Sequence, residues 1–340
     1  METIKIHTDI SQINVSDWDE LAKQSQEVSF FQTKPCYDFY VSLSFITPFI
    51  YAVSEKAKLK ALVWGYIIAD GNRVKRFFSR RAISPGGVLL SEDMPKDMIH
   101  LFLKSVSQDL SKKGVIYIEM RNHIDYSVYQ ENFRNAGFVY HRQLNFLVDL
   151  TEPEQVFSRL SKSKQRQIKV AGRAGVKWEE TRNENDIAAF YTILQRLYKT
   201  RVKRPLFPVE YIEKLVAYPQ GKLLVVKNSE GTVIGGMACF EQANQCLYEL
   251  FVCGSDEVFP KLYSSVMATW AGLEYSIRHN IAMFDFMGAG TPERYYGVRE
   301  FKSKFGGRLV EYGRFLYICR PVLYKLGRLW VETLAVKPKV

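Results

Sequence analysis

The hydrophobic pattern in the second half of the chain predicts a set of strands followed by one long helix. Apolar residues dominate the segments 222–227, 233–241 and 245–253, and short polar turns separate them. Short apolar runs bounded by turn residues are typical of buried strands. Apolar residues then recur at helical spacing from Leu262 to Arg278, and the run from Ile281 to Phe286 predicts a further strand. We therefore expect a sheet packed against a helix.

The first half repeats this order. Apolar runs from Leu59 to Ala69 and from Val74 to Ser79 flank Asp70-Gly71-Asn72, which predicts a hairpin. Helical spacing follows from Met98 to Lys112, and the run from Gly114 to Glu119 predicts a buried strand that ends in an acid. In both halves a short helix and a closing strand come next. The pattern indicates two degenerate copies of one α/β plan.

Candidate chemistry follows the last buried strand of the second copy. That strand ends near Gly288, and a polar loop leads to a short helix that carries Phe301 and Lys302. Gly306-Gly307 and a final strand complete the segment. Because ligands commonly bind beyond the carboxyl ends of buried strands, we expect the functional site here.

The motif D-F-x-G, followed by F-K-x-x-F-G-G, resembles the C-terminal signature of the FemABX family. The resemblance extends from about Trp18 to Pro321. It implies an α/β fold of two tandem GNAT-like acyltransferase domains, each a mixed sheet flanked by helices. These would cover residues 1–150 and 151–340, with a basic crossing segment at 151–180. The long coiled-coil arm of some members has no counterpart, because residues 181–221 leave room only for ordinary helices.

The resemblance also implies a reaction and its residues. FemABX enzymes transfer amino acids from aminoacyl-tRNA to the stem peptide of peptidoglycan precursors, and the lysine of their F-K pair, here Lys302, is functional. A cation there would stabilise the oxyanion of acyl transfer, typically by about 2.7–4 kcal/mol per donor. Phe301 would pack beneath it, and Glu300 or Asp285 would keep it protonated. Glu249 and Asp285 are candidate general bases, and substrate groups or water could serve instead. For Asp285, a role as a cap of the next turn is an equal alternative.

Three residues are predicted to bind substrate beside Asp285. Tyr248 occupies the position of a strand tyrosine near the family's substrate, and the alternative is a core aromatic. Arg201 lies in a basic segment that resembles another family motif, and its guanidinium would suit the phosphates of the precursor. Here the alternative is an exposed basic turn. Gly288 completes this set.

The chain carries a net charge of +11, which favours polyanionic partners. Residues 158–177 contain several Lys and Arg and no acid, and helical spacing directs Ile168 and Ala171 inward and Lys164 outward. Part of this segment resembles a family pattern. Arg166 and Lys169 are therefore predicted to contact tRNA or phosphate, and a solvated helix face is the alternative.

Several other classes of function are disfavoured. The N-terminus lacks the features of a signal peptide, and no apolar run is long enough to cross a bilayer, so we expect a cytoplasmic protein. The five cysteines contain no C-x-x-C pair and the histidines show no ligand spacing, so no metal is predicted. The segment 322–334 is basic and amphipathic. It is expected to pack on its own domain, and contact with the inner face of an anionic membrane is the alternative.

The sequence thus predicts a cytoplasmic aminoacyltransferase that acts on a UDP- or lipid-linked muropeptide, with aminoacyl-tRNA as co-substrate and no other cofactor. The alternative is an acyl-CoA-dependent N-acyltransferase of the GNAT type that acts on another amine. Its pyrophosphate loop would lie near Cys253–Tyr263, where the sequence CGSDEVFPKLY does not match the usual pattern. A nonenzymatic RNA-binding protein would leave the F-K motif unexplained, and no RRM or OB signature is present.

Overall fold

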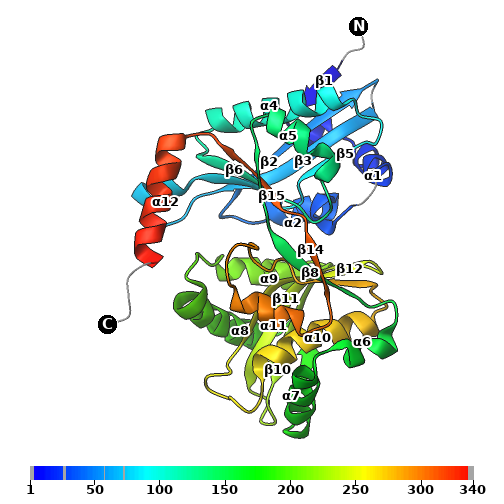
Figure 1. The fold of residues 1–340 in the computed structure, drawn as a ribbon, viewed down its shortest axis with the longest axis vertical. Coiled ribbons are helices and arrows are strands. Elements are labelled where there is room, and N and C mark those ends of the chain that lie inside the picture. Colours follow the sequence, from blue (N-terminus) through cyan, green and yellow to red (C-terminus); the bar gives the residue numbers. More distant parts are fainter. Residues whose placement is uncertain (1–3, 26–27, 57, 72, 336–340) are drawn as a thin grey trace. The chain divides into compact units, whose positions relative to one another are not determined.

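The computed structural model describes residues 4–25, 28–56, 58–71 and 73–335, which fold into two compact units (Figure 1). The first unit is Met1–Arg142 together with Tyr312–Val340, and the second is Gln143–Glu311. The second unit is therefore inserted into the sequence of the first.

One mixed sheet lies in each unit. In the first sheet, neighbouring strands follow the order β1 (Ile4–His7), β2 (Thr47–Glu55), β3 (Lys58–Ile68), β4 (Arg81–Ser84), β6 (Tyr117–Arg121), β15 (Arg314–Ile318), β7 (Val139–His141), and β5 (Val88–Leu90) pairs with β3. In the second sheet the order is β9 (Lys177–Glu180), β10 (Gly221–Lys227), β11 (Val233–Gln242), β12 (Cys246–Gly254), β13 (Met283–Asp285), β8 (Leu144–Asp149), β14 (Arg308–Glu311).

The two sheets share one plan. Each begins with an antiparallel series, β1 to β4 in the first and β9 to β12 in the second. Each then has a parallel pair, β4 with β6 and β12 with β13, in which the second strand follows a long helix. Each ends with two antiparallel strands. The predicted duplication and the predicted α/β fold class are confirmed.

The observed boundary between the units differs from the predicted division at residue 150. Strand β8 pairs with β13 and β14, so its backbone belongs to the second sheet. Strand β15 pairs with β6 and β7, so residues 314–318 belong to the first sheet. Strand β8 thus comes from the predicted first half but pairs in the second sheet, and β15 comes from the predicted second half but pairs in the first. Local sequence patterns do not reveal such long-range pairing.

Helices cover the sheets of both units. Those of the first unit are α1 (Val15–Lys23), α2 (Lys34–Val41), α3 (Arg73–Ser79), α4 (Lys96–Lys112), α5 (Gln130–Asn135) and α12 (Pro321–Ala335). Those of the second unit are α6 (Pro153–Arg159), α7 (Lys162–Arg173), α8 (Glu184–Leu197), α9 (Val209–Ala217), α10 (Ser264–Arg278) and α11 (Gly297–Ser303). A π-helical turn, Tyr198–Val202, extends α8. The region 181–221 thus holds two helices of ordinary length, α8 and α9, and this short π-helical turn, which leaves no room for a long coiled-coil arm, as predicted.

One predicted strand is wrong. Residues 74–79 belong to helix α3, and the hairpin partner of β3 is β4. The Ser79 hydroxyl accepts a hydrogen bond from the Asp70 amide and donates one to the Lys75 carbonyl, both at 2.8 Å. The bond to Asp70 connects the end of helix α3 to the end of the preceding segment. A helix therefore stands where Asp70-Gly71 had predicted a tight hairpin turn.

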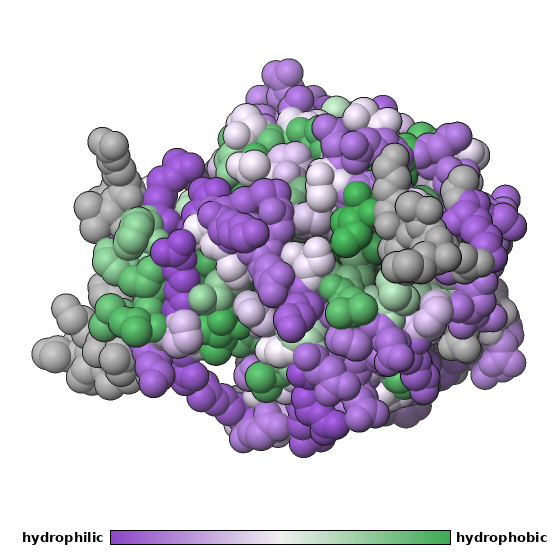
Figure 2. All heavy atoms as spheres, turned by 90° about the horizontal axis from the view of Figure 1, so that it is seen from above, coloured by the Kyte–Doolittle hydropathy of each residue, from purple (hydrophilic) through white to green (hydrophobic). Residues whose placement is uncertain are grey.

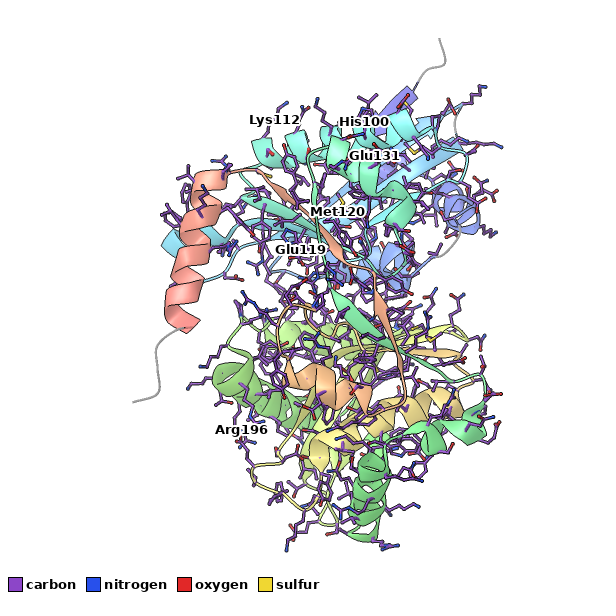
Figure 3. The ribbon with its side chains drawn as sticks, viewed as in Figure 1. His100, Lys112, Glu119, Met120, Glu131 and Arg196 are labelled. Carbon is purple, nitrogen blue, oxygen red and sulfur yellow. The ribbon has the colours of Figure 1, made fainter. Side chains whose placement is uncertain are left out.

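The first unit neutralises a pair of arginines inside its sheet. Arg121 on β6 and Arg314 on β15 are cross-strand neighbours, an arrangement that like charges disfavour. Both donate to the same oxygen of Glu119, which lies on β6 (Figure 3), at 2.7 and 3.0 Å. Burial alone would raise the pKa of Glu119, but the two arginines lower it to about 2. This acid therefore stabilises strand pairing.

Gly306, which follows α11, is predicted to tolerate no side chain. Its φ is +79°, and a Cβ would lie 2.9 Å from the Arg159 carbonyl oxygen. Gly306→Ala should lower the free energy of unfolding by more than about 1 kcal/mol, measured by denaturant titration. Gly172→Ala on α7, where no atom lies within 4 Å of the new Cβ, should instead stabilise by about 0.5–1 kcal/mol. Equal responses of the two variants would contradict this account.

Candidate active site

Strands β12 and β13 diverge at their carboxyl ends in the second unit. They pair in parallel only over 246–248 and 283–285, although β12 continues to Gly254. A β-bulge interrupts the pairing of β12 with β11 near Glu249, the first residue after Tyr248. Diverging parallel strands leave backbone groups and side chains available to a ligand or to a residue that enters between them.

Lys302 bridges the two diverging strands. It is 8% exposed, and helix α11 brings its ammonium to the segment that follows β13. The Nζ atom donates to the carbonyl oxygens of Phe286 at 2.5 Å and Gly288 at 3.0 Å. It also lies 3.0 Å from a carboxylate oxygen of Glu249 on β12. Three acceptors thus surround an ammonium group that has three hydrogens to donate.

Glu249 is the most unusual acid of this site. It is 3% exposed, and burial raises the pKa of its carboxyl, while Lys302 offsets part of that rise. Its second oxygen, Oε2, has no hydrogen-bond partner among the residues that the structure describes. A buried carboxylate oxygen without a donor is costly, and perturbed acids of this kind occur preferentially at functional sites. The predicted partners of Lys302 were Glu300 and Asp285, and the structure places Glu249 there instead.

Glu300 does not face Lys302. It lies on the exposed side of α11, where its carboxylate pairs with Lys304 at 2.9 Å and accepts from the Tyr295 hydroxyl at 3.0 Å. The reason is helical geometry, because residues two apart on a helix point in different directions.

Asp285 and Asn145 shape the loop that receives the lysine. Asp285 Oδ1 accepts from the Met287 amide at 2.5 Å and from the Asn145 side chain at 2.7 Å. The side-chain oxygen of Asn145, Oδ1, in turn accepts from the Gly288 backbone amide at 2.7 Å. Met287 and Gly288 have positive φ values of 57° and 127°, so these bonds hold an otherwise unfavourable backbone turn. This geometry matches the capping alternative for Asp285.

Asn145 was not among the predicted site residues. The available signal was a polar residue near the start of the mostly apolar strand β8, at a position that the structure buries. A buried amide needs partners, and its position in a strand therefore indicates a polar neighbour across the sheet.

Lys164 joins the basic helix α7 to α11. Its Nζ lies 4.0 Å from the ring centroid of Phe301 and 5.3 Å from that of Phe305. The prediction that Lys164 projects outward is wrong, since it is 6% exposed. It lies one helical turn before Ile168 and so shares the buried face of α7. Aromatic faces attract the ammonium and allow this burial.

The burial of Lys164 should appear in the pH dependence of stability. Burial and the nearby Lys304 lower its pKa to about 8 from the ordinary 10.5. Between these values the unfolded chain binds more protons, so stability rises with pH. We expect the free energy of unfolding of the wild type to increase, relative to Lys164→Met, from pH 8 to pH 10. A difference that stays constant with pH would contradict a desolvated charge at this position.

Tyr248 and Lys302 are not on the same face of the second sheet. Tyr248 is adjacent to Glu249 on β12, so the two side chains point to opposite faces. Tyr248 is 5% exposed and its hydroxyl donates to Gln242 at 3.0 Å. This placement agrees with the core alternative for Tyr248.

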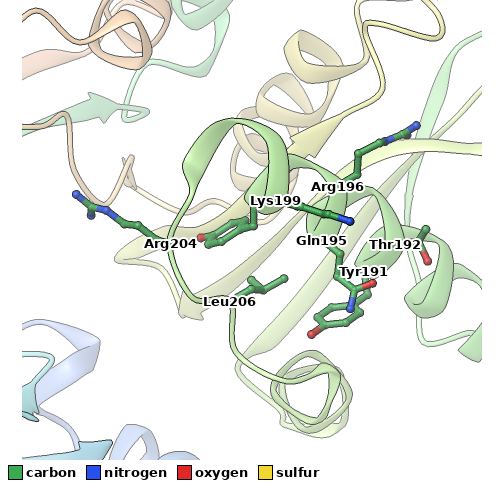
Figure 4. A pocket seen from close by; sticks show the side chains of 8 residues that line it. Tyr191, Thr192, Gln195, Arg196, Lys199, Arg204 and Leu206 are labelled. Carbon is green, nitrogen blue, oxygen red and sulfur yellow. The ribbon is translucent and has the colours of Figure 1, made fainter. Parts of the chain in front are cut away.

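Arg201 lies apart from this constellation, on the π-helical turn after α8. It is exposed and pairs with the exposed Glu257. A nearby open pocket of about 570 Å³ is lined by Tyr191, Thr192, Gln195, Arg196, Tyr198, Lys199, Arg204 and Leu206. Arg196 and Arg204 point to opposite sides of it (Figure 4), so their guanidinium groups do not converge on one anion.

Arg166 and Lys169 are exposed on α7, as expected of residues that contact a polyanion or of a solvated face.

Residues 4–25, 28–56, 58–71 and 73–335 contain no group of three His, Cys, Asp or Glu that could hold a metal ion. Cys239, Cys246 and Cys253 are buried in strands, where burial raises their thiol pKa values.

Comparison with known proteins agrees with this architecture. Residues 224–331, which contain β12, β13 and α11, match the sequence model of the FemAB family. The crystal structure of FemX superposes with a TM-score of 0.68 at 12% identity, covering 94% of this chain and 99% of FemX. No curated protein sequence matches the chain significantly.

Two other solved structures share the fold. A tandem GNAT protein from the clavulanic acid biosynthesis pathway has a TM-score of 0.63 at 10% identity, covering 94% of this chain and 99% of its own. The C-terminal domain of a putative lysylphosphatidylglycerol synthetase from Agrobacterium fabrum has a TM-score of 0.59 at 13% identity, covering 96% and 97%. The chain thus shares the tandem GNAT-like fold of these acyltransferase structures over nearly its whole length, and residues 224–331 resemble the FemAB family in sequence.

Proposed function

We propose that the protein transfers an aminoacyl group from aminoacyl-tRNA to an amine of the stem peptide of a peptidoglycan precursor. The observation that carries this proposal is the buried Lys302–Glu249 pair between the diverging ends of β12 and β13. It combines a cation with an acid of raised pKa, the two groups that acyl transfer to an amine requires.

In the proposed reaction, the amine nitrogen attacks the ester carbonyl of the aminoacyl-tRNA. An N–C bond forms, and the carbonyl oxygen becomes an oxyanion that the charge of Lys302 stabilises. Glu249 Oε2 accepts the proton released by the amine, since this oxygen has no other partner among the described residues. Collapse of the intermediate breaks the C–O ester bond, and the proton passes to the ribose hydroxyl that leaves.

Helix α7 supports tRNA as the donor. Its exposed cations, Lys162, Arg166, Lys169 and Arg173, follow one another along a helix without acids. Lys164 attaches this helix to Phe301, the neighbour of Lys302 in sequence. A phosphate backbone bound along α7 would therefore lie against the helix that carries the proposed catalytic residue.

The start of α10 argues against coenzyme A. In an acyl-CoA enzyme of this fold the pyrophosphate loop would lie near residues 253–263, directly before this helix. Here Asp256 Oδ1 accepts from the Ser265 amide at 3.2 Å and from the Ser264 hydroxyl at 2.9 Å. A carboxylate thus occupies backbone donors that a pyrophosphate would need and repels a second anion.

Product mass tests the proposal. The purified protein is incubated with UDP-muramyl pentapeptide and either charged tRNA, uncharged tRNA or acetyl-CoA. We expect a mass gain of one amino-acid residue only with charged tRNA. An acetyl-sized gain would instead favour the acyl-CoA alternative, and no gain with any donor would remove the role in cell-wall synthesis.

Salt dependence tests the donor separately. Binding of tRNA should weaken steeply as salt increases, because phosphate contacts release counterions. The double variant Arg166→Gln/Lys169→Gln should reduce the slope of log affinity against log salt by about 2. Arg134→Gln/Lys112→Gln, which removes two exposed cations of the first unit, serves as the matched control. An equal change in both double variants would contradict a specific role of α7.

A further inference from the structure

Two helices of the first unit leave a strip of apolar side chains in solvent. On α3, Phe77 is 61% and Phe78 44% exposed. On α12, Val322 is 71% and Leu326 50% exposed. The helices are in contact, and a Cβ built on Gly327 of α12 would lie 3.6 Å from the Phe78 carbonyl. These four side chains form what we call the α3–α12 patch.

Packing explains why these side chains face outward. The ring of Tyr324 on α12 packs edge-on against Tyr117 of β6, with centroids 5.5 Å apart. This contact fixes the inner face of α12, as the predicted packing on its own domain requires. Val322 and Leu326, one turn apart, share another face, together with exposed Lys325. The two Phe rings of α3 contact each other at 5.2 Å and remain solvent-exposed.

Cations lie on the same two segments as the patch. Among the side chains that the structure describes there, those of Lys75, Arg76, Arg320, Lys325 and Arg328 are exposed. Neither residues 73–79 nor residues 320–328 contain an acid. Figure 2 shows hydrophobic atoms beside hydrophilic ones at the left edge of the molecule, the side on which Figure 1 draws α12. Apolar and basic side chains are therefore mixed over one small surface.

We propose that the α3–α12 patch binds the surface of an anionic phospholipid membrane. Phe, Val and Leu side chains can insert at the boundary of headgroups and acyl chains, while Lys and Arg contact the lipid phosphates. A protein partner is the weaker fit, because protein interfaces are depleted of lysine. Nucleic acid would leave the aliphatic Val322 and Leu326 unused. No helix within residues 4–25, 28–56, 58–71 and 73–335 is long and apolar enough to span a membrane, so the contact is peripheral.

Vesicle cosedimentation tests this directly. The full chain is mixed with vesicles of pure phosphatidylcholine or with vesicles that also contain about 30% phosphatidylglycerol. Phosphatidylglycerol gives the vesicle surface the negative charge that attracts basic segments. We expect binding to the anionic vesicles that weakens as salt increases. Each cation near the surface contributes about five-fold in affinity, so Lys75→Glu/Arg76→Glu should weaken binding by about 25-fold or more. Phe77→Ser/Phe78→Ser should weaken it at least ten-fold.

Matched variants of the same unit are the controls. Leu101→Ser/Val128→Ser removes two hydrophobic side chains that are 50% and 65% exposed, and Lys104→Glu/Lys112→Glu reverses two exposed cations of α4. Both controls should bind nearly as the wild type does. Equal losses in control and patch variants, or no binding to anionic vesicles, would overturn the proposal. So would self-association in solution that only the patch variants abolish, because a second copy would then cover the patch.

This inference does not rest on the proposed aminoacyl transfer. Vesicle binding is measured without substrate or turnover, and no residue of the patch belongs to the site around Lys302. Loss of transfer in a Glu249 variant with intact vesicle binding would separate the two proposals experimentally.

Discussion

Glu249→Gln is expected to lower kcat by about 10²–10⁴-fold, the usual contribution of a positioned general base. Glutamine keeps the shape of the side chain and an oxygen that can accept from Lys302, but it cannot take the proton of the attacking amine. Stability should also fall, because the substitution leaves the buried ammonium of Lys302 without its carboxylate, so the rate is measured under conditions where the variant is shown to be folded. Transfer is followed by product mass under single-turnover conditions.

The pH dependence of the rate gives this prediction a second readout. In the wild type, the rate should rise with pH as Glu249 loses its proton, at a value above the ordinary pKa of glutamate. Glu249→Gln should remove this acidic limb. The matched control is Glu241→Gln on the adjacent strand β11, where the carboxylate accepts from Tyr275 at 2.7 Å. A wild-type pH profile in Glu249→Gln would assign the base to another group.

Lys302→Met is expected to abolish transfer and also to destabilise the second unit, by about 3–5 kcal/mol at neutral pH. The lysine neutralises Glu249 and holds the Phe286 and Gly288 carbonyls, so its loss leaves a buried carboxylate and two buried acceptors without partners. Because Lys302 is buried, it stabilises the fold in addition to its proposed role in transfer.

The destabilisation should depend on pH with a defined sign. Without Lys302, the folded-state pKa of Glu249 rises further above its unfolded value of about 4.3. The deficit in Lys302→Met should therefore be smallest near that value, where the two unpaired carbonyls account for it, and should grow as pH increases. Denaturant titrations at pH 4.5 and pH 7.5 measure it, within the range where the wild type stays folded. A deficit that does not change with pH would show that Glu249 is not the charge that Lys302 neutralises.

The sequence was sufficient to predict those features that depend on local pattern. Apolar runs located β10, β11 and β12, helical spacing located α4 and α10, and the F-K motif located the short helix that carries Lys302. The doubled plan was also visible, because each copy repeats its elements in the same order. The pattern did not show that β8 joins the second sheet and β15 the first, because tertiary packing determines which strands far apart in sequence pair.

The constellation around Lys302 was only partly predictable for the same reason. Lys302 and Asp285 follow from a motif, and Glu249 was one of two acids considered as a base. That Glu249 pairs with Lys302 depends on the divergence of β12 from β13 beyond Tyr248, which no spacing encodes. Lys164 was misplaced because a lysine at a helical position normally indicates solvent, and two aromatic rings override that tendency here.

The most direct test of the central claim is transfer by the double variant Lys302→Met/Glu249→Gln. Removing both charges should restore most of the stability lost in Lys302→Met, because no unpaired carboxylate remains buried. Product mass is then measured with charged tRNA and UDP-muramyl pentapeptide under conditions where this variant is shown to be folded. We predict a folded protein that forms no aminoacylated product. Product formation at the wild-type rate would contradict the assignment of the Lys302–Glu249 pair as the catalytic centre.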